Sequence, residues 1–174
     1  ETKEETKQET AETVNYVKKL TAVTHNAIPV VDPHNSSGTG SGPNWVYNMI
    51  YDTLIEFTQD GDYIPRIALS WDSDNGQDYD LKIRDDVYFT NGEQLTTDDV
   101  AYTIDSAKEA MGNLTYDRFS PVESYDIVDD FEMILHLGSV NVDFMKGLSY
   151  PCCGILNRDA CEADPEEGNE SKVE

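Results

Sequence analysis

A two-residue period of apolar and charged positions runs through residues 78–84. Every second side chain there is apolar and the others are charged, which is typical of a strand with one buried face and one face in water. A two-residue period also places Phe131, Met133, Leu135 and Leu137 on one face of 131–137, which we expect to form a hairpin with 125–128. These segments predict an antiparallel sheet, with residues 87–89 as a further strand beside 78–84.

Helical periods mark two longer segments. Apolar side chains recur every three or four positions in 43–57, which begins with a proline suited to a first helical turn. A second helix is predicted from Thr96 to Met111. Thr96 can cap its first turn, Asp99 suits the positive end of the helix dipole, and Gly112 ends the helix. Each helix has one apolar stripe, so each is expected to be partly buried.

The remaining apolar segments are short and are separated by turn residues. We expect a strand at 20–24, a helical turn or irregular core at 64–71, a short helix at 142–148 and a last strand at 151–156. Residues 35–42 contain only Asn, Ser, Gly and Thr, a composition typical of a loop. The 174 residues are enough for one ordinary domain. The predicted fold class is α+β, a small mixed or antiparallel sheet with packed helices.

Acidic residues outnumber basic ones throughout the chain. There are 35 Asp and Glu against 12 Lys and Arg, a formal net charge of −23. Residues 1–13 carry −3 and residues 162–174 carry −5, so the part between them still carries −15. Such a surface repels phosphate backbones and anionic lipid headgroups, so we expect no nucleic-acid partner. Two interpretations stay open, solubility in a salty exterior and attraction of cationic ligands.

The two ends differ in composition from the centre. Residues 1–19 begin with a run of Glu, Thr, Lys and Gln, typical of a solvated acidic tether, and 161–174 form an acidic tail. A frayed chain end is the alternative interpretation of the tether. No run approaches the roughly 18 apolar residues of a membrane helix. The first residues also lack the basic and then apolar order of a secretory signal.

Three cysteines lie near the C-terminus, at positions 152, 153 and 161. Their spacing does not match the paired ligands of a zinc site, so no metal is predicted. In an extended segment only one of two adjacent cysteines can turn toward Cys161. For a secreted protein we expect one disulfide, between Cys152 and Cys161, and one leftover thiol. Three free buried thiols are the alternative.

No catalytic constellation is recognisable. His25, His34 and His136 are separated in sequence, and none of them forms an i, i+4 pair or lies next to a cysteine or a serine elbow. Nucleophile-elbow, phosphate-loop and dinucleotide motifs are absent from the sequence. The acidic stretch 72–78 lacks the glycine and glutamate positions of an EF-hand. We therefore predict no catalytic residues, no cofactor and no enzymatic activity. An acid hydrolase that uses paired carboxylates stays open as an alternative function.

Four blocks, in a fixed order, resemble the N-terminal part of the extracellular solute-binding proteins of peptide-type ABC transporters, family 5. They are IYDTL at 50–54, GDYIPRIALSW at 61–71, YDLKIRDDVYF at 79–89 and NGEQLTTDDV at 91–100. Upstream, Val31-Asp32-Pro33 resembles the family's Leu-Asp-Pro. The similarity covers most of residues 20–110.

The resemblance implies a type II periplasmic-binding-protein-like receptor with two lobes. Residues 20–34 would be the first strand and extended segment of lobe one, and 35–160 its small inserted α+β subdomain. The second lobe would lie outside this chain, which we interpret as an N-terminal fragment. The loop after Asp-Pro faces the ligand in the family, and the matching candidates are Asn35, Ser36, Ser37, Thr39 and Trp45.

The implied function is to capture extracellular peptides, or a similar small solute, and to deliver them to an ABC permease. The fragment alone is expected to bind weakly or not at all, because such receptors bind by closing two lobes. An extracellular or periplasmic location is implied, with a lipid anchor on an upstream cysteine. The unpaired strand at 20–24 predicts a homodimer by strand swapping. A stand-alone acidic cell-surface interaction module is the alternative function.

Overall fold

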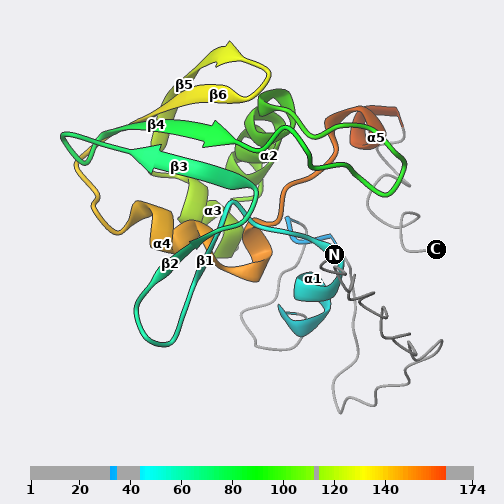
Figure 1. Ribbon diagram of the computed structural model, residues 1–174, viewed down its shortest axis with the longest axis horizontal. Helices are drawn as coiled ribbons and strands as arrows, with labels where there is room; N and C mark the ends of the chain where they lie inside the picture. The colour runs from blue at the N-terminus through cyan, green and yellow to red at the C-terminus, as the bar shows by residue number, and fades with distance from the viewer. Residues whose placement is uncertain (1–31, 35–43, 112–113, 164–174) are drawn as a thin grey trace, which may run out of the picture.

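A four-stranded antiparallel sheet in the order β3-β4-β6-β5 is the centre of the protein (Figure 1). The computed structural model describes residues 32–34, 44–111 and 114–163. The sheet contains β3 (Ala68–Asp72), β4 (Asp78–Ile83), β5 (Val122–Asp129) and β6 (Glu132–Leu137). A separate pair joins β1 (Ile55–Phe57) to β2 (Tyr63–Pro65).

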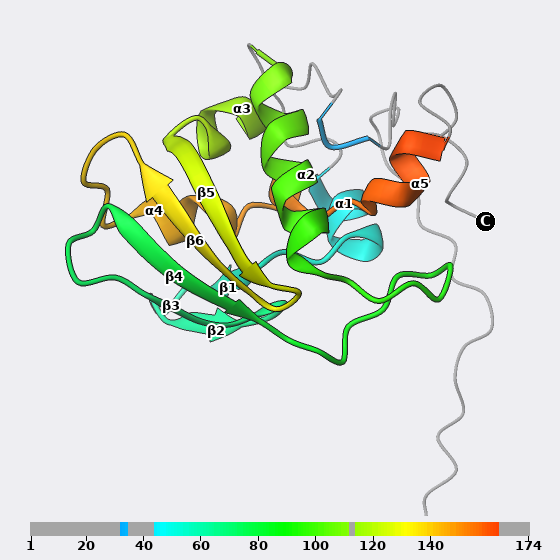
Figure 2. The same cartoon turned by 90° about the horizontal axis from the view of Figure 1, so that it is seen from above.

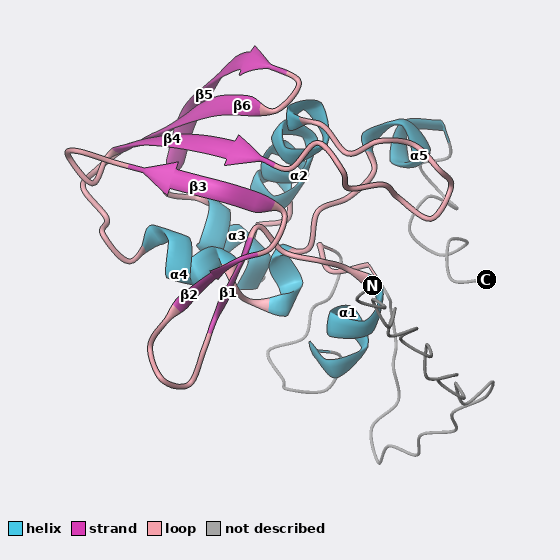
Figure 3. Cartoon of the chain, viewed as in Figure 1, coloured by secondary structure: helices cyan, strands magenta, loops and turns pink. Residues whose placement is uncertain are grey.

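Helices lie on one side of this sheet, as the two cartoon views show (Figures 2 and 3). They are α1 (Asn44–Ile50), α2 (Thr97–Glu109), α3 (Leu114–Phe119), α4 (Phe144–Leu148), the 3₁₀ helix η1 (Pro151–Cys153) and α5 (Arg158–Ala163). The result is an α+β fold of two layers, as the sequence predicts.

The strands with the clearest alternation form as predicted. β4 and β6 pair in a register that places Tyr79 opposite Leu135 and Leu81 opposite Met133. These side chains are all buried, and the residues between them are half-buried or exposed. The hairpin of β5 and β6 is also confirmed. A two-residue period therefore located the inner face of the sheet correctly.

The helix predicted at 96–111 is confirmed as α2, with the expected capping. The backbone N–H of Thr96 donates to Oδ2 of Asp99 at 2.9 Å, which closes the first turn. Val100, Ile104 and Ala107 are buried in the core. Met111 does not continue the stripe, because α2 ends at Glu109 and leaves Met111 77% exposed.

Two predictions around the first helix were wrong. α1 ends at Ile50, and residues 55–57 of the predicted helix form β1 instead. Of residues 64–71, expected as a helical turn or irregular core, 64–65 lie in β2 and 68–71 lie in β3. Both wrong predictions have the same physical reason. β1 pairs with β2 and β3 pairs with β4, and backbone pairing overrides the helical spacing of the apolar side chains.

Two other predicted strands are not strands of the sheet. Residues 87–89 make one isolated bridge, between Tyr88 and Gln94, because both edges of β4 are already occupied by β3 and β6. Residues 151–156 begin with η1, whose proline suits the start of a helix. Neither of the short helices α3 and α5 was predicted. The strand expected at 20–24, the tether and the swapped dimer lie outside the described residues.

The core lies between the inner face of the sheet and α2, and Leu135 is at its centre with no exposed surface. We predict that Leu135→Ala lowers the free energy of unfolding by about 2–5 kcal/mol, because it removes buried methyl groups and leaves a cavity. Urea denaturation measures the loss. Leu69→Ala is the control, since Leu69 is 58% exposed, and a change larger than about 0.5 kcal/mol there would contradict this interpretation.

On the outer face of the sheet, one histidine joins three strands. His136 of β6 contacts Asp78 of β4 through Nδ1 at 2.7 Å and Asp126 of β5 through Nε2 at 3.1 Å. The hydrogen bond to Asp78, followed by the one to Asp126, raises the pKa of His136. The bond to His136 is also the main reason that the pKa of Asp78 is lowered. Each partner therefore favours the charged form of the other.

We predict that the contacts of His136 with Asp78 and Asp126 make the stability of the folded protein depend on pH. The raised pKa of His136 means that its contribution is complete below about pH 6.5 and is lost as the pH rises through the folded-state value. The lowered pKa of Asp78 means that its contribution is lost as the pH falls through its own folded-state value. The difference in urea midpoint between wild type and His136→Gln should therefore shrink between about pH 5.5 and about pH 8.5.

Lys82→Gln is the matched control for the histidine variant. Lys82 and Glu132 form an ion pair of 3.5 Å on the same sheet, without a histidine. The effect of Lys82→Gln should stay the same over this pH range. A constant effect of His136→Gln would show that the histidine does not hold the strands by its charge.

Candidate functional site

The segment Asp32, Pro33 and His34 is buried against helices that follow it far later in the chain. Nδ1 of His34 and Oγ of Ser106 on α2 are 2.9 Å apart. The hydroxyl of Thr115 on α3 donates to the carbonyl of Pro33 at 3.0 Å. Asp32 and His34 are only 3% and 5% exposed. Two helices therefore hold this segment in place immediately before residue 35.

Burial sets the charge state of the segment. Removal from water lowers the pKa of His34 to about 4, so its imidazole is neutral at neutral pH. The carboxylate of Asp32 accepts a hydrogen bond from the backbone N–H of His34 at 2.8 Å. The pKa of Tyr51 is raised, mainly by burial and secondly by Asp32. A neutral imidazole and a carboxyl group thus lie together in a largely dry region.

Helix α1 holds the chain after residue 43, so both flanks of residues 35–43 are described. The hydroxyl of Tyr47 donates to the carbonyl of Asp32 at 3.4 Å, which links α1 to the buried segment. α1 also packs against η1. Gly154 leaves room for Tyr51 there, because an added Cβ would overlap the Cβ of Tyr51 and lie 2.9 Å from its Cγ.

The side chains of the predicted ligand-facing residues are not among those that the structure describes. Asn35, Ser36, Ser37 and Thr39 lie outside the described residues. Trp45 is in α1, and its side chain is not described. The roles proposed for these residues stay predictions.

Sequence reasoning missed the hydrogen-bonding groups of α2 and α3 that hold the flanking segments. Thr103 lies in the apolar stripe of α2 and is fully buried, and its hydroxyl accepts from the backbone N–H of Leu156 at 3.0 Å. Ser106 contacts the imidazole of His34, and Thr115 donates to the carbonyl of Pro33. A hydroxyl in an otherwise apolar stripe was the available signal. It marks a buried hydrogen bond without identifying its partner.

All three cysteines are buried, and the described residues do not contain the disulfide predicted between Cys152 and Cys161. The hydrogen bond with Cys153 is the main reason that the pKa of Cys152 is lowered to about 7. Cys161 instead lies beside Tyr102, whose pKa is raised to about 12, mainly by burial. The disulfide stays a prediction for oxidising conditions.

The described residues contain no group of three or more His, Cys, Asp or Glu side chains placed to hold a metal ion. Across the same ranges, the helices are too short or too polar to cross a bilayer. What this region does offer is two buried anchors, residues 32–34 and α1, on either side of residues 35–43.

Comparison with solved structures defines the class of protein. The chain is similar to NikZ from Campylobacter jejuni, solved with Ni(L-His), at a TM-score of 0.71 and 25% identity over 84% of this chain and 29% of that one. It has the same fold as Haemophilus influenzae OppA, solved with RPPGFSPFR, at a TM-score of 0.71 and 17% identity over 81% of this chain and 31% of that one. These are type II periplasmic-binding-protein-like receptors.

The family follows from the sequence match. Residues 62–172 match the model of bacterial extracellular solute-binding proteins, family 5, and the chain belongs to this family. It is a family of transport proteins and not of enzymes, and its members are periplasmic or extracellular. A curated relative, the nickel-binding periplasmic protein of Escherichia coli K12, is 37% identical over 62 residues, which are 34% of this chain and 12% of that protein. The chain thus spans less than a third of the length of the relatives named here.

We predict that Gly154→Ala loosens the attachment of α1. The added methyl group must displace Tyr51 or move η1, which costs about 1–3 kcal/mol of stability. Hydrogen exchange at the backbone N–H of Ile155, which donates to the carbonyl of Asp52 at 3.0 Å, should become faster.

Gly138→Ala is the matched control for this change. An added Cβ at Gly138 would lie at an ordinary 3.8 Å from the nearest side chain, that of Glu123. It should leave exchange at Ile155 unchanged. Equal exchange in both variants would mean that close packing at Gly154 does not hold α1.

Proposed function

We propose that this chain is part of the solute-binding component of an ABC transporter. In this role it captures a small solute outside the cytoplasmic membrane and delivers it to a permease. The observation that carries the proposal is the family match over residues 62–172. The buried anchors of the Asp32 segment and α1 support it, because they present residues 35–43 from a rigid base.

A peptide is the first candidate solute, and a nickel complex is the second. The peptide follows from the resemblance of the four sequence blocks to peptide-type receptors and from the fold shared with an oligopeptide receptor. Sequence identity favours the nickel complex. NikZ, solved with Ni(L-His), and the nickel-binding periplasmic protein are 25% and 37% identical to this chain over the matched parts. Asn35, Ser36, Ser37, Thr39 and Trp45 are the proposed ligand contacts in either case.

The remaining parts of the proposal concern the whole receptor. A receptor that closes two lobes buries its ligand from both sides, so the 174-residue chain alone should bind weakly or not at all. A lipid anchor upstream of Glu1 would keep the receptor near its permease, with residues 1–19 as the tether. If the isolated chain dimerises, residues 20–24 are the segment that we expect to be exchanged.

Calorimetric titration tests the proposed function. A receptor that joins this chain to the remaining parts of a family member is titrated with a tripeptide, with Ni²⁺ and histidine together, and with Ni²⁺ alone. We expect saturable binding of the peptide or of the nickel–histidine mixture, and binding at least about 100-fold weaker by the 174-residue chain. An absence of binding in all titrations would favour the alternative, an acidic surface module with a protein partner.

A variant in α1 tests one of the proposed contacts. Trp45→Ala should weaken binding by about tenfold or more, because aromatic side chains contribute large contact areas in ligand sites. Met49→Ala is the control on the same helix, since Met49 is 66% exposed. If both variants bind equally well, Trp45 does not contact the ligand.

A further inference from the structure

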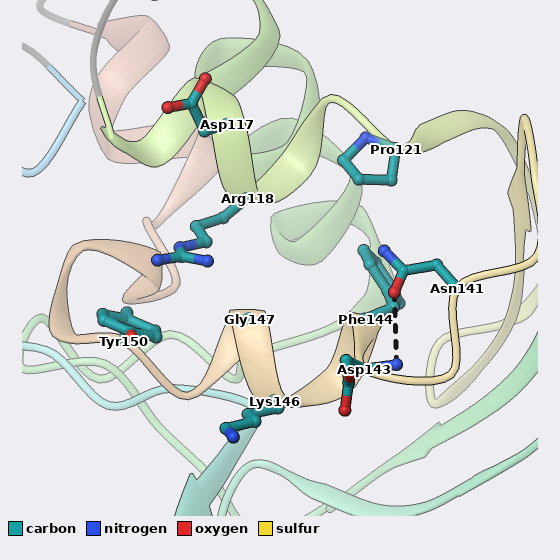
Figure 4. Close-up of a pocket in the computed structure, with 9 residues that line it drawn as sticks. All are labelled: Asp117, Arg118, Pro121, Asn141, Asp143, Phe144, Lys146, Gly147 and Tyr150. Atoms are coloured by element: carbon teal, nitrogen blue, oxygen red, sulfur yellow. Dashed lines mark hydrogen bonds between the residues drawn. The ribbon is translucent and has the colours of Figure 1, made fainter.

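A cavity of about 340 Å³ opens between α3 and α4 (Figure 4). Its lining includes Arg118 from α3, Lys146 and Gly147 from α4, and Tyr150 just after α4. The volume lies at the lower end of the range for small-molecule sites, roughly 300–1,000 Å³. None of these residues is among the proposed ligand contacts Asn35, Ser36, Ser37, Thr39 and Trp45.

Arg118 differs from the other arginines of this acidic chain. Three arginines each have a carboxylate within 4.0 Å; the pairs are Arg66 with Asp52, Arg84 with Asp86, and Arg158 with Asp98. Within the described ranges Arg118 has no such carboxylate, and its Nε is buried without a hydrogen-bond partner. A buried donor that lacks an acceptor costs free energy, and the cost is larger for a charged group.

The position of the guanidinium is set before any ligand arrives. Cζ of Arg118 lies 4.0 Å from the centroid of the Tyr150 ring, and Figure 4 shows the side chain extending from α3 past Gly147 toward that ring. An added Cβ at Gly147 would lie 3.5 Å from Cδ of Arg118, so the stem rests on the glycine. Stacking uses the face of the guanidinium and leaves N–H groups at its edge for a ligand.

A second cationic residue, Lys146, also lines the cavity. Nζ of Lys146 lies 4.5 Å from the centroid of the Phe57 ring, and no carboxylate of the described residues is within ion-pair distance of it. Two positive side chains without an acidic partner among the described residues therefore line one cavity in a chain of net charge −23. This juxtaposition favours a negatively charged occupant.

The shape and charge of the lining favour a carboxylate over a phosphate. A guanidinium fork matches the two oxygens of a planar carboxylate. Asp117 and Asp143 also line the cavity and repel a dianion more strongly than a monoanion. We infer that this cavity binds the carboxylate group of a small organic acid, with Arg118 as the fork and Lys146 as the second cation.

Titration of the 174-residue chain, labelled with ¹⁵N, tests the site. N-acetylglycinate is the probe, N-acetylglycinamide is its matched control without a carboxylate, and inorganic phosphate tests for a general anion site, all at constant ionic strength. The expected result is a saturable shift of the Gly147 and Tyr150 amide signals with N-acetylglycinate alone. The inference is overturned if these signals do not move, or if the amide control or phosphate moves them equally.

Substitutions assign the binding to the two cations. Arg118→Lys keeps the charge but loses the fork, and it should weaken N-acetylglycinate binding roughly tenfold. Lys146→Gln should also weaken it, and this exposed position keeps the test independent of any loss of folding in the Arg118 variant. Arg84→Gln is the control, since Arg84 is exposed and paired with Asp86. Unchanged binding by both Arg118→Lys and Lys146→Gln would overturn the assignment.

Discussion

The antiparallel pairing of β4 with β6 is the constraint on which the rest of the structure depends. β4 ends at Ile83 and β6 begins at Glu132, so this pairing closes a long segment of chain and costs conformational entropy. Burial of the two inner faces offsets that cost, because Leu81 and Leu135 have no exposed surface. α2 lies within the closed segment and packs on those faces. Its position then decides where the N-terminal and C-terminal segments attach.

α2 joins the core to the region proposed for binding. Its apolar stripe faces the sheet, while Ser106 contacts His34 and Thr103 contacts Leu156. The two described histidines of this structure respond to pH in opposite directions. Burial lowers the pKa of His34, so protonation of the unfolded chain opposes the anchored state as the pH falls below about 6.5. The carboxylates around His136 raise its pKa and so favour the folded sheet in the same range.

The parts of the fold that could be predicted from sequence are those with a strong local signal. β4, β6 and α2 have clear periods of apolar side chains, and α2 also has a capping residue. All three elements form as expected. β1, β2 and β3 were missed because they are only 3, 3 and 5 residues long, too short for a period to be recognised, and pairing with their neighbours makes them strands. Of the site, the Asp32-Pro33 motif was recognised from the family resemblance. Its attachment to Ser106 and Thr115 was not, since these residues lie more than 70 positions away.

The sequence by itself determined the family, the acidic character and the α+β class, because four ordered motifs, charge and periodicity are properties of residues near one another in the chain. Only the tertiary structure decided that Asp32 and His34 are buried and that Arg118 and Lys146 share one cavity. The physical reason is that both results depend on contacts between segments far apart in sequence. The free energy of burial and charge pairing depends on the neighbours that folding supplies, and a local pattern does not specify those neighbours.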